Sequence, residues 1–255
     1  MDLGLAGRRA LVCGASRGIG AAVAGVLAAE GARVVLAARD STALRERADE
    51  LRAIAVPVDL ATPEGGSRAV TAAADALGGL DLLWVNSGGP PPGSFRELDE
   101  SAWAAAIEGT LLSVVRLVRA ALPTLSASDV PAVGVTLSSS VREPIPGLVT
   151  SNVLRPGLVG LVKSLVSEIA PVRINAIAPG RISTQRIEQL DTKRAADAGT
   201  TPDEVRRQTV ARIPLGRYGE PLEVGRVAAF LLSPAASYVN GTVVAVDGGM
   251  VRSLP

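Results

Sequence analysis

Short β-branched runs alternate with longer Ala- and Leu-rich segments along the whole chain, and this alternation restricts the fold more than any other feature. The apolar runs span 8–14, 32–38, 53–59, 80–86, 132–138, 172–180 and 241–249. Segments between them, such as 18–30, 43–52 and 63–77, have helical periodicity. Strands that are apolar on both faces and separated by helices are typical of a parallel sheet covered on both sides. The pattern predicts an α/β fold, a doubly wound seven-stranded parallel sheet with helices on both faces.

The 255 residues contain no repeat, low-complexity tract or linker, so we expect a single domain spanning 1–255. One charged segment with few aromatic residues, 181–215, interrupts the alternation after the sixth predicted strand. In a doubly wound sheet this position lies outside the carboxyl ends of the strands, where ligands bind. We interpret 181–215 as a substrate-covering lid; the alternative is a surface excursion without a role.

Charge and composition remove several classes of function. The formal net charge is +1, which favours neither nucleic acid nor an anionic membrane as a partner. The chain has no histidine and one cysteine, Cys13, so we predict no disulfide, no metal site and no catalytic triad that needs histidine. No apolar run reaches the roughly 18 residues of a membrane span, and the N-terminal residues do not resemble a signal peptide. We therefore expect a cytoplasmic protein.

The stretch "CGASRGIGAA" places Gly14, Gly18 and Gly20 directly after the first predicted strand, where a helix begins. Glycines at such a junction permit a tight turn and let backbone N–H groups approach a pyrophosphate. The N-terminal end of the following helix favours the negative charge of that group. The junction therefore predicts a dinucleotide site.

The residues after the second predicted strand indicate which dinucleotide binds. A carboxylate there usually holds the ribose 2′-hydroxyl of NAD. Here the chain reads "VVLAARD", with Arg39 at that place and Arg17 inside the glycine turn. Two guanidinium groups suit a 2′-phosphate, so we predict NADP(H) rather than NAD(H). Asp40 is the alternative determinant, because its carboxylate would reverse the preference if it turned toward the ribose.

Several further stretches carry a resemblance to a known family. They are "GASRGIG", "PVDL", "VNSGG", "VTLSSS", "INAIAPGRIST", "IPLGRYGEP" and "YVNGTVVAVDGG". Over essentially its whole length the chain resembles the short-chain dehydrogenase/reductase (SDR) family, in particular its 3-oxoacyl-acyl-carrier-protein reductases. The resemblance implies one Rossmann-like domain, a nicotinamide cofactor, oxidoreduction of a small-molecule carbonyl or alcohol, and a homotetramer or homodimer.

The resemblance also assigns cofactor contacts. It implies that Asp59 contacts the adenine, that Asn86, Gly88 and Gly89 line the cofactor cleft, and that Ile182 and Thr184 hold the nicotinamide amide. Together with the glycine turn and the two arginines, the predicted cofactor-binding residues are Gly14, Ser16, Arg17, Gly18, Ile19, Gly20, Arg39, Asp59, Asn86, Gly88, Arg155, Pro179, Gly180, Ile182 and Thr184.

The chain departs from the family at the catalytic residues. The family uses a Tyr to move the proton, a Lys four residues later, a Ser on the substrate carbonyl and an Asn in a water relay. Matching the motifs places Ser151 at the Tyr, Arg155 at the Lys and Thr110 at the Asn. The family Ser is retained as Ser139 or its neighbour Ser138, and the spacing does not decide between them.

This departure matters because the serine hydroxyl is a far weaker acid than a phenol, whose pKa lies near 10. Ser151 is also too short to reach the phenol's position beside a carbonyl, and Arg155 stays protonated. Glu143 is the nearest carboxyl group in the following loop, although an exposed charge paired with Arg142 is the simpler interpretation. Three hypotheses remain: an atypical reductase, a silent cofactor-binding sensor or oligomer partner, and a cleft recruited for another reaction.

Overall fold

The computed structural model describes residues 2–253 and confirms the predicted α/β fold. Seven strands form one sheet in the order β3-β2-β1-β4-β5-β6-β7, and every neighbouring pair is parallel. The strands are β1 (Arg9–Cys13), β2 (Arg33–Ala38), β3 (Ile54–Pro57), β4 (Leu82–Val85), β5 (Ala132–Thr136), β6 (Arg173–Pro179) and β7 (Val243–Val246).

Helices connect the strands and cover both faces of the sheet. They are α1 (Gly18–Ala29), α2 (Thr42–Leu51), α3 (Gly65–Leu77), α4 (Glu100–Ala106), α5 (Ser113–Leu125), α6 (Val149–Glu168), α7 (Gln185–Ala198), α8 (Pro202–Val210) and α9 (Pro221–Leu232). A π-helical segment, Ile107–Leu112, joins α4 to α5, and short 3₁₀ turns lie at Ser139–Val141 and Pro234–Ala236.

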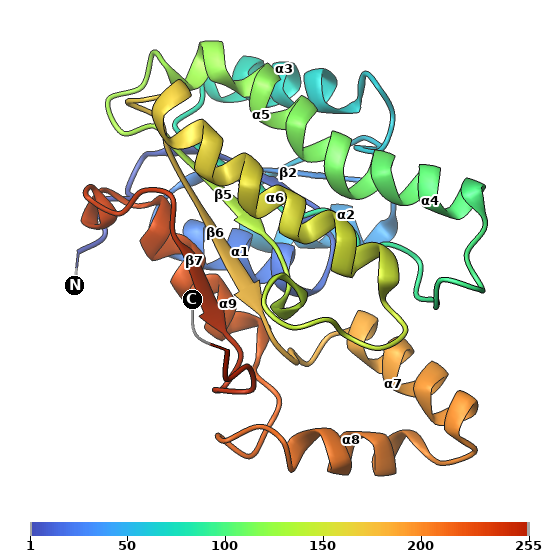
Figure 1. Cartoon of the computed structure of the whole chain (residues 1–255). Coiled ribbons are helices and arrows are strands. Elements are labelled where there is room, and N and C mark those ends of the chain that lie inside the picture. Colours follow the sequence, from blue (N-terminus) through green and yellow to red (C-terminus); the bar gives the residue numbers. More distant parts are fainter. Residues whose placement is uncertain (1, 254–255) are drawn as a thin grey trace.

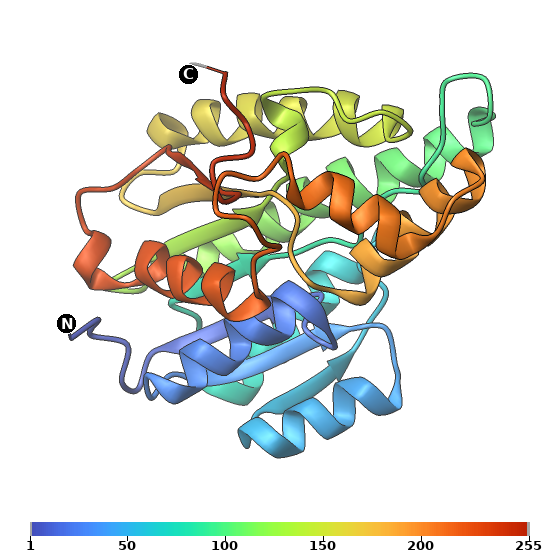
Figure 2. The same ribbon diagram turned by 90° about the horizontal axis from the view of Figure 1, so that it is seen from below.

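Two apolar cores lie on opposite faces of the sheet. Helices α3, α5 and α6 pack on one face, and α1, α2 and α9 pack on the other (Figures 1 and 2). The inner strands are apolar on both sides because both of their faces are covered, which explains why their sequences read as continuous apolar runs. Trp84 of β4 is fully buried and pairs with Gly134 of β5, where a Cβ atom would lie 2.2 Å from the indole ring.

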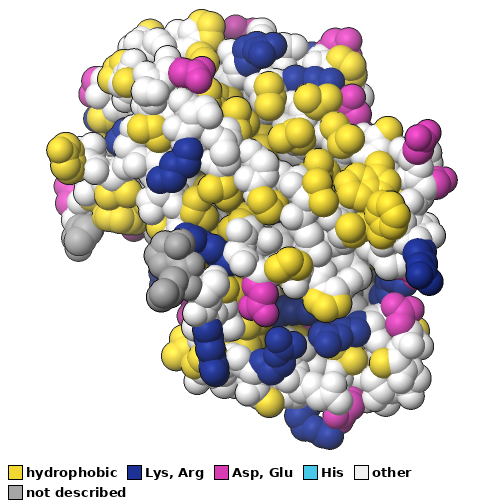
Figure 3. Space-filling view, viewed as in Figure 1, with side chains coloured by type: hydrophobic (Ala, Val, Ile, Leu, Met, Phe, Trp, Pro, Cys, Tyr) yellow, Lys and Arg dark blue, Asp and Glu magenta, His cyan; other side chains and the backbone are white. Residues whose placement is uncertain are grey.

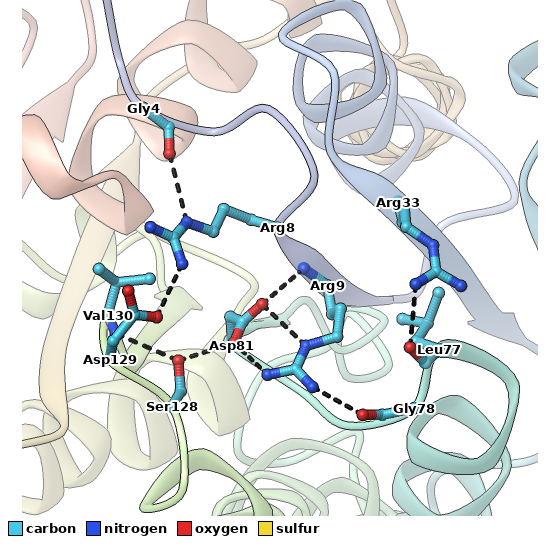
Figure 4. Close-up of polar contacts among 10 residues, drawn as sticks. All are labelled: Gly4, Arg8, Arg9, Arg33, Leu77, Gly78, Asp81, Ser128, Asp129 and Val130. Carbon is cyan, nitrogen blue, oxygen red and sulfur yellow. Dashed lines mark hydrogen bonds and ion pairs between the residues drawn. The ribbon is translucent and has the colours of Figure 1, made fainter.

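A polar network holds the amino ends of β1, β4 and β5 together (Figure 4). Asp81 Oδ2 accepts hydrogen bonds from the backbone N–H and Nε of Arg9, at 2.8 and 3.0 Å. Its Oδ1 accepts from Arg9 Nη2 at 2.6 Å and from Ser128 Oγ at 2.7 Å. Burial alone would raise the pKa of Asp81, but these hydrogen bonds outweigh it and lower the pKa to about 2. Buried side-chain hydrogen bonds therefore occupy the amino ends of these strands, and we expect a ligand site at the carboxyl ends instead.

Segment 181–215 folds mainly into α7 and α8, which follow β6 at the carboxyl end of the sheet (Figure 1). Asp191 of α7 is buried and ties this segment to the chain beyond it. Its Oδ2 accepts from the hydroxyl of Tyr218 at 2.8 Å, and its Oδ1 pairs with Arg181 Nη1 at 3.2 Å. The position agrees with the predicted lid, while its role in covering a substrate stays a prediction. No helix within residues 2–253 combines the length and apolarity needed to cross a bilayer.

Candidate cofactor and active site

The strand order creates a topological switch point at the carboxyl edge. Strands β1 and β4 are neighbours, but the chain leaves β1 toward β2 on one side and leaves β4 toward β5 on the other. The connections therefore diverge and open a crevice between the ends of β1 and β4. In open α/β sheets ligands bind in such a crevice.

The predicted glycine turn lines this crevice, and its glycines are required by close backbone approaches. Gly14 has a φ of +60°, and a Cβ atom there would lie 2.1 Å from the carbonyl oxygen of Asn86. A Cβ atom at Gly20 would lie 2.2 Å from the carbonyl oxygen of Gly14. Asn86 Nδ2 donates to that same oxygen at 3.2 Å, which joins the turn to the end of β4.

Helix α1 begins at Gly18 without a side-chain cap, because Arg17 makes no capping hydrogen bond. Its first backbone N–H groups are therefore available to an anion, and the helix dipole favours negative charge there. The residues present fit the pyrophosphate of a dinucleotide: Gly14, Ser16, Gly18, Ile19 and Gly20 would surround it.

The residues predicted to contact the 2′-phosphate and the adenine lie near the carboxyl ends of β2 and β3 and in the glycine turn. Arg17 and Arg39 are both exposed, and Arg17 Nη1 donates to Gln185 Oε1 at 2.8 Å. Asp40 is held by Arg45, whose Nη2 contacts both carboxylate oxygens at 2.5 and 2.7 Å. Asp59 follows β3, is exposed, and accepts a hydrogen bond from its own loop.

The loop after β6 brings the predicted nicotinamide contacts beside the glycine turn. Pro179 ends β6, and Gly180 has no room for a side chain because a Cβ atom would lie 2.7 Å from Asp247. Ile182 is buried, and Thr184 accepts the capping hydrogen bond of α7. The methyl group of Thr184 would lie 3.3 Å from a Cβ atom at Gly18. The structure therefore brings these residues, distant in sequence, to one side of the crevice.

The run of three serines meets α6 at the proposed catalytic position. Ser140 Oγ lies 3.1 Å from Ser151 Oγ, and both side chains are buried. Ser139 is buried too, whereas Ser138 caps the 3₁₀ turn by accepting from the backbone N–H of Ser140. Ser138 and Ser139 were the predicted candidates and Ser140 was not, because its contact with Ser151 depends on how the turn orients each hydroxyl.

Arg155, one turn further along α6, is 6% exposed and lies in the same region. Its Nη1 donates to the carbonyl oxygen of Thr136, at the end of β5, at 2.8 Å. Burial lowers the pKa of Arg155 to about 10, and the positive charge of Arg186 adds to that effect. Arg186 was not among the predicted site residues. It lies in the first turn of α7, and its Nη2 donates to the carbonyl oxygen of Pro90 at 2.6 Å.

Thr110 lies in the π-helical segment, which packs against α6. It is fully buried, and its Oγ1 has no hydrogen-bond partner within residues 2–253. The hydroxyls of Thr136 and Ser87, at the ends of β5 and β4, share this property in the described chain. Single π turns inside helices are common at functional sites. These hydroxyls are therefore candidates to hold a water or a ligand.

A doubly wound parallel sheet with a glycine-lined, uncapped helix start at its switch point defines a dinucleotide-binding α/β protein. A family model described as enoyl-(acyl-carrier-protein) reductase matches residues 14–251. The 3-oxoacyl-[acyl-carrier-protein] reductase of Vibrio cholerae is 32% identical over 97% of this chain and 99% of its own. The cis-4-hydroxycyclohexanecarboxylate dehydrogenase of Sinomonas cyclohexanicum is 35% identical over 98% of each.

Solved structures agree with these relatives. L-sorbose reductase from Gluconobacter frateurii, complexed with NADPH and L-sorbose, superposes with a TM-score of 0.93 and 31% identity over the whole of both chains. An actinorhodin polyketide ketoreductase variant with NADPH gives a TM-score of 0.92 at 28% identity, over 97% of this chain and 98% of its own. The chain belongs to the short-chain dehydrogenase/reductase family of nicotinamide-dependent oxidoreductases. The predicted family and fold are thereby confirmed.

Proposed function

We propose that this protein is an NADP(H)-dependent oxidoreductase that interconverts a carbonyl and an alcohol at an atypical centre built from serine and arginine. The observation that carries the proposal is the glycine turn at the switch point, formed by Gly14, Gly18 and Gly20 and called the glycine cradle below. A Cβ atom at Gly14 or at Gly20 would lie 2.1 or 2.2 Å from a backbone carbonyl oxygen, so neither position has room for a side chain. Relatives named as 3-oxoacyl reductase, sorbose reductase and hydroxycyclohexanecarboxylate dehydrogenase support carbonyl–alcohol chemistry.

The preference for NADP(H) rests on the charges beside β2. Both carboxylate oxygens of Asp40 are already engaged by Arg45, which supports the view that Asp40 does not hold a ribose 2′-hydroxyl. Arg39 and Arg17 remain exposed there, and guanidinium groups bind phosphate through paired hydrogen bonds. Two structural relatives that carry NADPH support the same choice.

Bound cofactor supplies the hydride, and the residues of this chain position the substrate and handle charge. Arg155 has five N–H donors, of which one bonds to Thr136, so others can hold the nicotinamide ribose and stabilise a negative carbonyl oxygen. The serine cluster at Ser139, Ser140 and Ser151 would donate hydrogen bonds to that oxygen. Neither serine nor arginine is an acid of phenol strength, so the proton for the oxygen would come from water held near Thr110.

The same lack of an acid favours a second candidate function. A protein with an intact cradle and no group that titrates near neutral pH at Ser151 or Arg155 can bind the cofactor without turning it over. Such a protein would be a cofactor-dependent sensor or a silent partner in an oligomer.

Titration of the purified protein with NADPH and with NADH, followed by cofactor fluorescence, tests the cofactor assignment. We expect micromolar binding with NADPH preferred by about tenfold or more, equivalent to 1.4 kcal/mol. The variant Arg39→Ser should lose this preference, whereas Arg52→Ser, exposed at the end of α2, should keep it. Tighter binding of NADH would show that Asp40 sets the choice, and no binding of either would refute the oxidoreductase proposal.

A variant that restores the family residues separates the two candidate functions. Ser151→Tyr with Arg155→Lys needs Ser140→Ala as well, because a tyrosine ring would begin where Ser151 Oγ now lies 3.1 Å from Ser140. If the triple variant gains ketone reductase activity that the natural protein lacks, the scaffold is competent and its own residues silence it. If the natural protein reduces ketones and the variant is slower, serine and arginine are the working residues.

We also propose that 181–215 covers the substrate and that the protein forms a homotetramer or homodimer. The lid assignment is supported by the N-cap residue of α7, Thr184, which lies beside the glycine turn. Exposed Val153 on α6 is consistent with a contact between copies. Light scattering of the purified protein measures the oligomeric state, and a monomer at micromolar concentration would refute the second proposal.

A further inference from the structure

Two arginines at the carboxyl edge, Arg155 and Arg186, are at least partly buried and have no carboxylate partner among residues 2–253. Burial distinguishes them from the arginines of the lid that are likewise unpaired in this range, Arg194, Arg206 and Arg212, which are exposed. Arg181 pairs with Asp191, and Arg217 pairs with Glu223. Within residues 2–253, neither Arg155 nor Arg186 forms a salt bridge. Each donates one hydrogen bond to a backbone carbonyl oxygen.

Burying these charges without a counter-ion is unfavourable. Arg155 is 6% exposed and Arg186 is half-buried, and desolvation lowers the pKa of both. Each guanidinium also repels the other. Nε and Nη2 of Arg155 have no hydrogen-bond partner in the described chain. They are not among its solvent-inaccessible unpaired polar atoms, so solvent-accessible space adjoins them. An anion in that space would neutralise both charges.

The loop after β4 is shaped around Arg186. Gly89 precedes Pro90, whose carbonyl oxygen accepts from Arg186, and a Cβ atom at Gly89 would lie 3.0 Å from Arg186 Nε. A side chain at 89 would therefore require the guanidinium group to shift slightly. Arg155 is held in the same way at the end of the neighbouring strand, through the carbonyl of Thr136. Pro90 lies in the loop after β4 and Thr136 ends the adjacent strand β5, and the charge of Arg186 acts on Arg155, so we place both cations at one side of the crevice.

This side is not where the cofactor phosphates are expected. The pyrophosphate belongs at the start of α1, and the 2′-phosphate belongs beside Arg39 after β2. The ends of β4 and β5 lie on the opposite side of the switch point, beside Ser151 and thus beside the reacting carbonyl. Lys and Arg side chains also gather where the α7–α8 lobe meets the rest of the molecule (Figure 3), which would attract an anion.

We propose that Arg155 and Arg186 together bind the carboxylate of the substrate, so that the substrate class is a carbonyl or hydroxy acid rather than a neutral ketone. This inference rests on the proposed function. In the reduction, hydride from NADPH forms a C–H bond at the carbonyl carbon, and a proton from water completes the alcohol. The carboxylate is unchanged and serves to orient the substrate.

Calorimetric titration of the protein, with and without saturating NADP⁺, tests the proposal. The probes are acetoacetate, levulinate and 4-oxocyclohexanecarboxylate, each compared with its neutral methyl ester. We expect at least one acid to bind about tenfold or more tightly than its ester. Arg186→Gln should remove that difference and leave NADPH affinity unchanged, and Arg186→Lys should retain part of it. Arg194→Gln, exposed on the same helix, is the matched control and should behave as the natural protein.

Two results would overturn the inference. In the first, no acid binds more tightly than its ester. In the second, Arg186→Gln weakens NADPH binding about tenfold or more and leaves the acid preference intact, which would assign the pair to a cofactor phosphate. A protein that binds acids but no cofactor would refute the proposed function and retain this inference. Circular dichroism of each variant verifies that it is folded.

Discussion

Replacing Arg155 by methionine should make the protein more stable while impairing its site. Burial lowers the pKa of Arg155 from 12.5 to about 10, and each unit corresponds to 1.36 kcal/mol, so the charged group costs about 3 kcal/mol in the folded state. Loss of the hydrogen bond to Thr136 offsets about 1–2 kcal/mol of that gain. Methionine fills a similar volume with apolar atoms. We therefore expect the free energy of unfolding to rise by about 1–2 kcal/mol.

Urea unfolding at pH 7, followed by circular dichroism, measures this change. Arg173→Met is the matched control, because Arg173 is also desolvated but is satisfied by backbone partners. Its guanidinium donates to the carbonyl oxygens of Leu231, Leu232, Ser233 and Val239. Leaving these oxygens without a donor should lower the free energy of unfolding by about 3 kcal/mol or more.

The two variants should therefore change stability in opposite directions. If Arg155→Met lowers the free energy of unfolding by more than about 1 kcal/mol, the guanidinium group stabilises the fold. The inference that its unfavourable burial serves the binding of an anion would then be wrong. The same variant should also lose NADPH and carboxylate affinity. Retention of both would remove Arg155 from the site.

Three further predictions concern other parts of the fold. Asp81→Asn should lower the free energy of unfolding by about 2 kcal/mol, because the pKa of Asp81 is depressed to about 2 in the folded protein. The carboxylate therefore contributes this stability above about pH 4 and loses it as the pH falls toward about 2. Urea unfolding across that pH range measures the loss. Gly20→Ala should abolish NADPH binding in a fluorescence titration, since its Cβ would lie 2.2 Å from a backbone oxygen, whereas Gly157→Ala, with open space around it, should bind normally. Tyr218→Phe removes the hydrogen bond to Asp191, so limited proteolysis should cleave 181–215 faster; an unchanged rate would show that this bond does not anchor the segment.

The sequence predicted the larger elements well because their signals are local. Each inner strand is covered on both faces, so it reads as a continuous apolar run. The glycine turn could be predicted because no residue with a Cβ atom fits at Gly14 or Gly20, where that atom would lie 2.1 or 2.2 Å from a backbone oxygen. The absence of a Tyr-x-x-x-Lys sequence from the chain was likewise visible without coordinates, and the placing of Ser151 and Arg155 at those positions stays a prediction.

Contacts between distant segments could not be read in this way. Ser138, Ser139 and Ser140 are identical in type, and the turn geometry alone gives Ser140 the contact with Ser151. Arg186 is one of many arginines in the chain, and nothing in its neighbours marks it until the loop at Gly89 and Pro90 is folded against it.

The sequence by itself determined the sheet, the glycine cradle and the loss of the tyrosine and lysine, because each depends on residues within one element or one junction. The tertiary structure alone decided which charges are neutralised. It joined Asp40 to Arg45 and Asp191 to Arg181, and among residues 2–253 it left Arg155 and Arg186 without a carboxylate, beside the end of β5 and the loop after β4. Electrostatic pairing depends on distance and burial across the fold, and neither quantity exists in a linear chain.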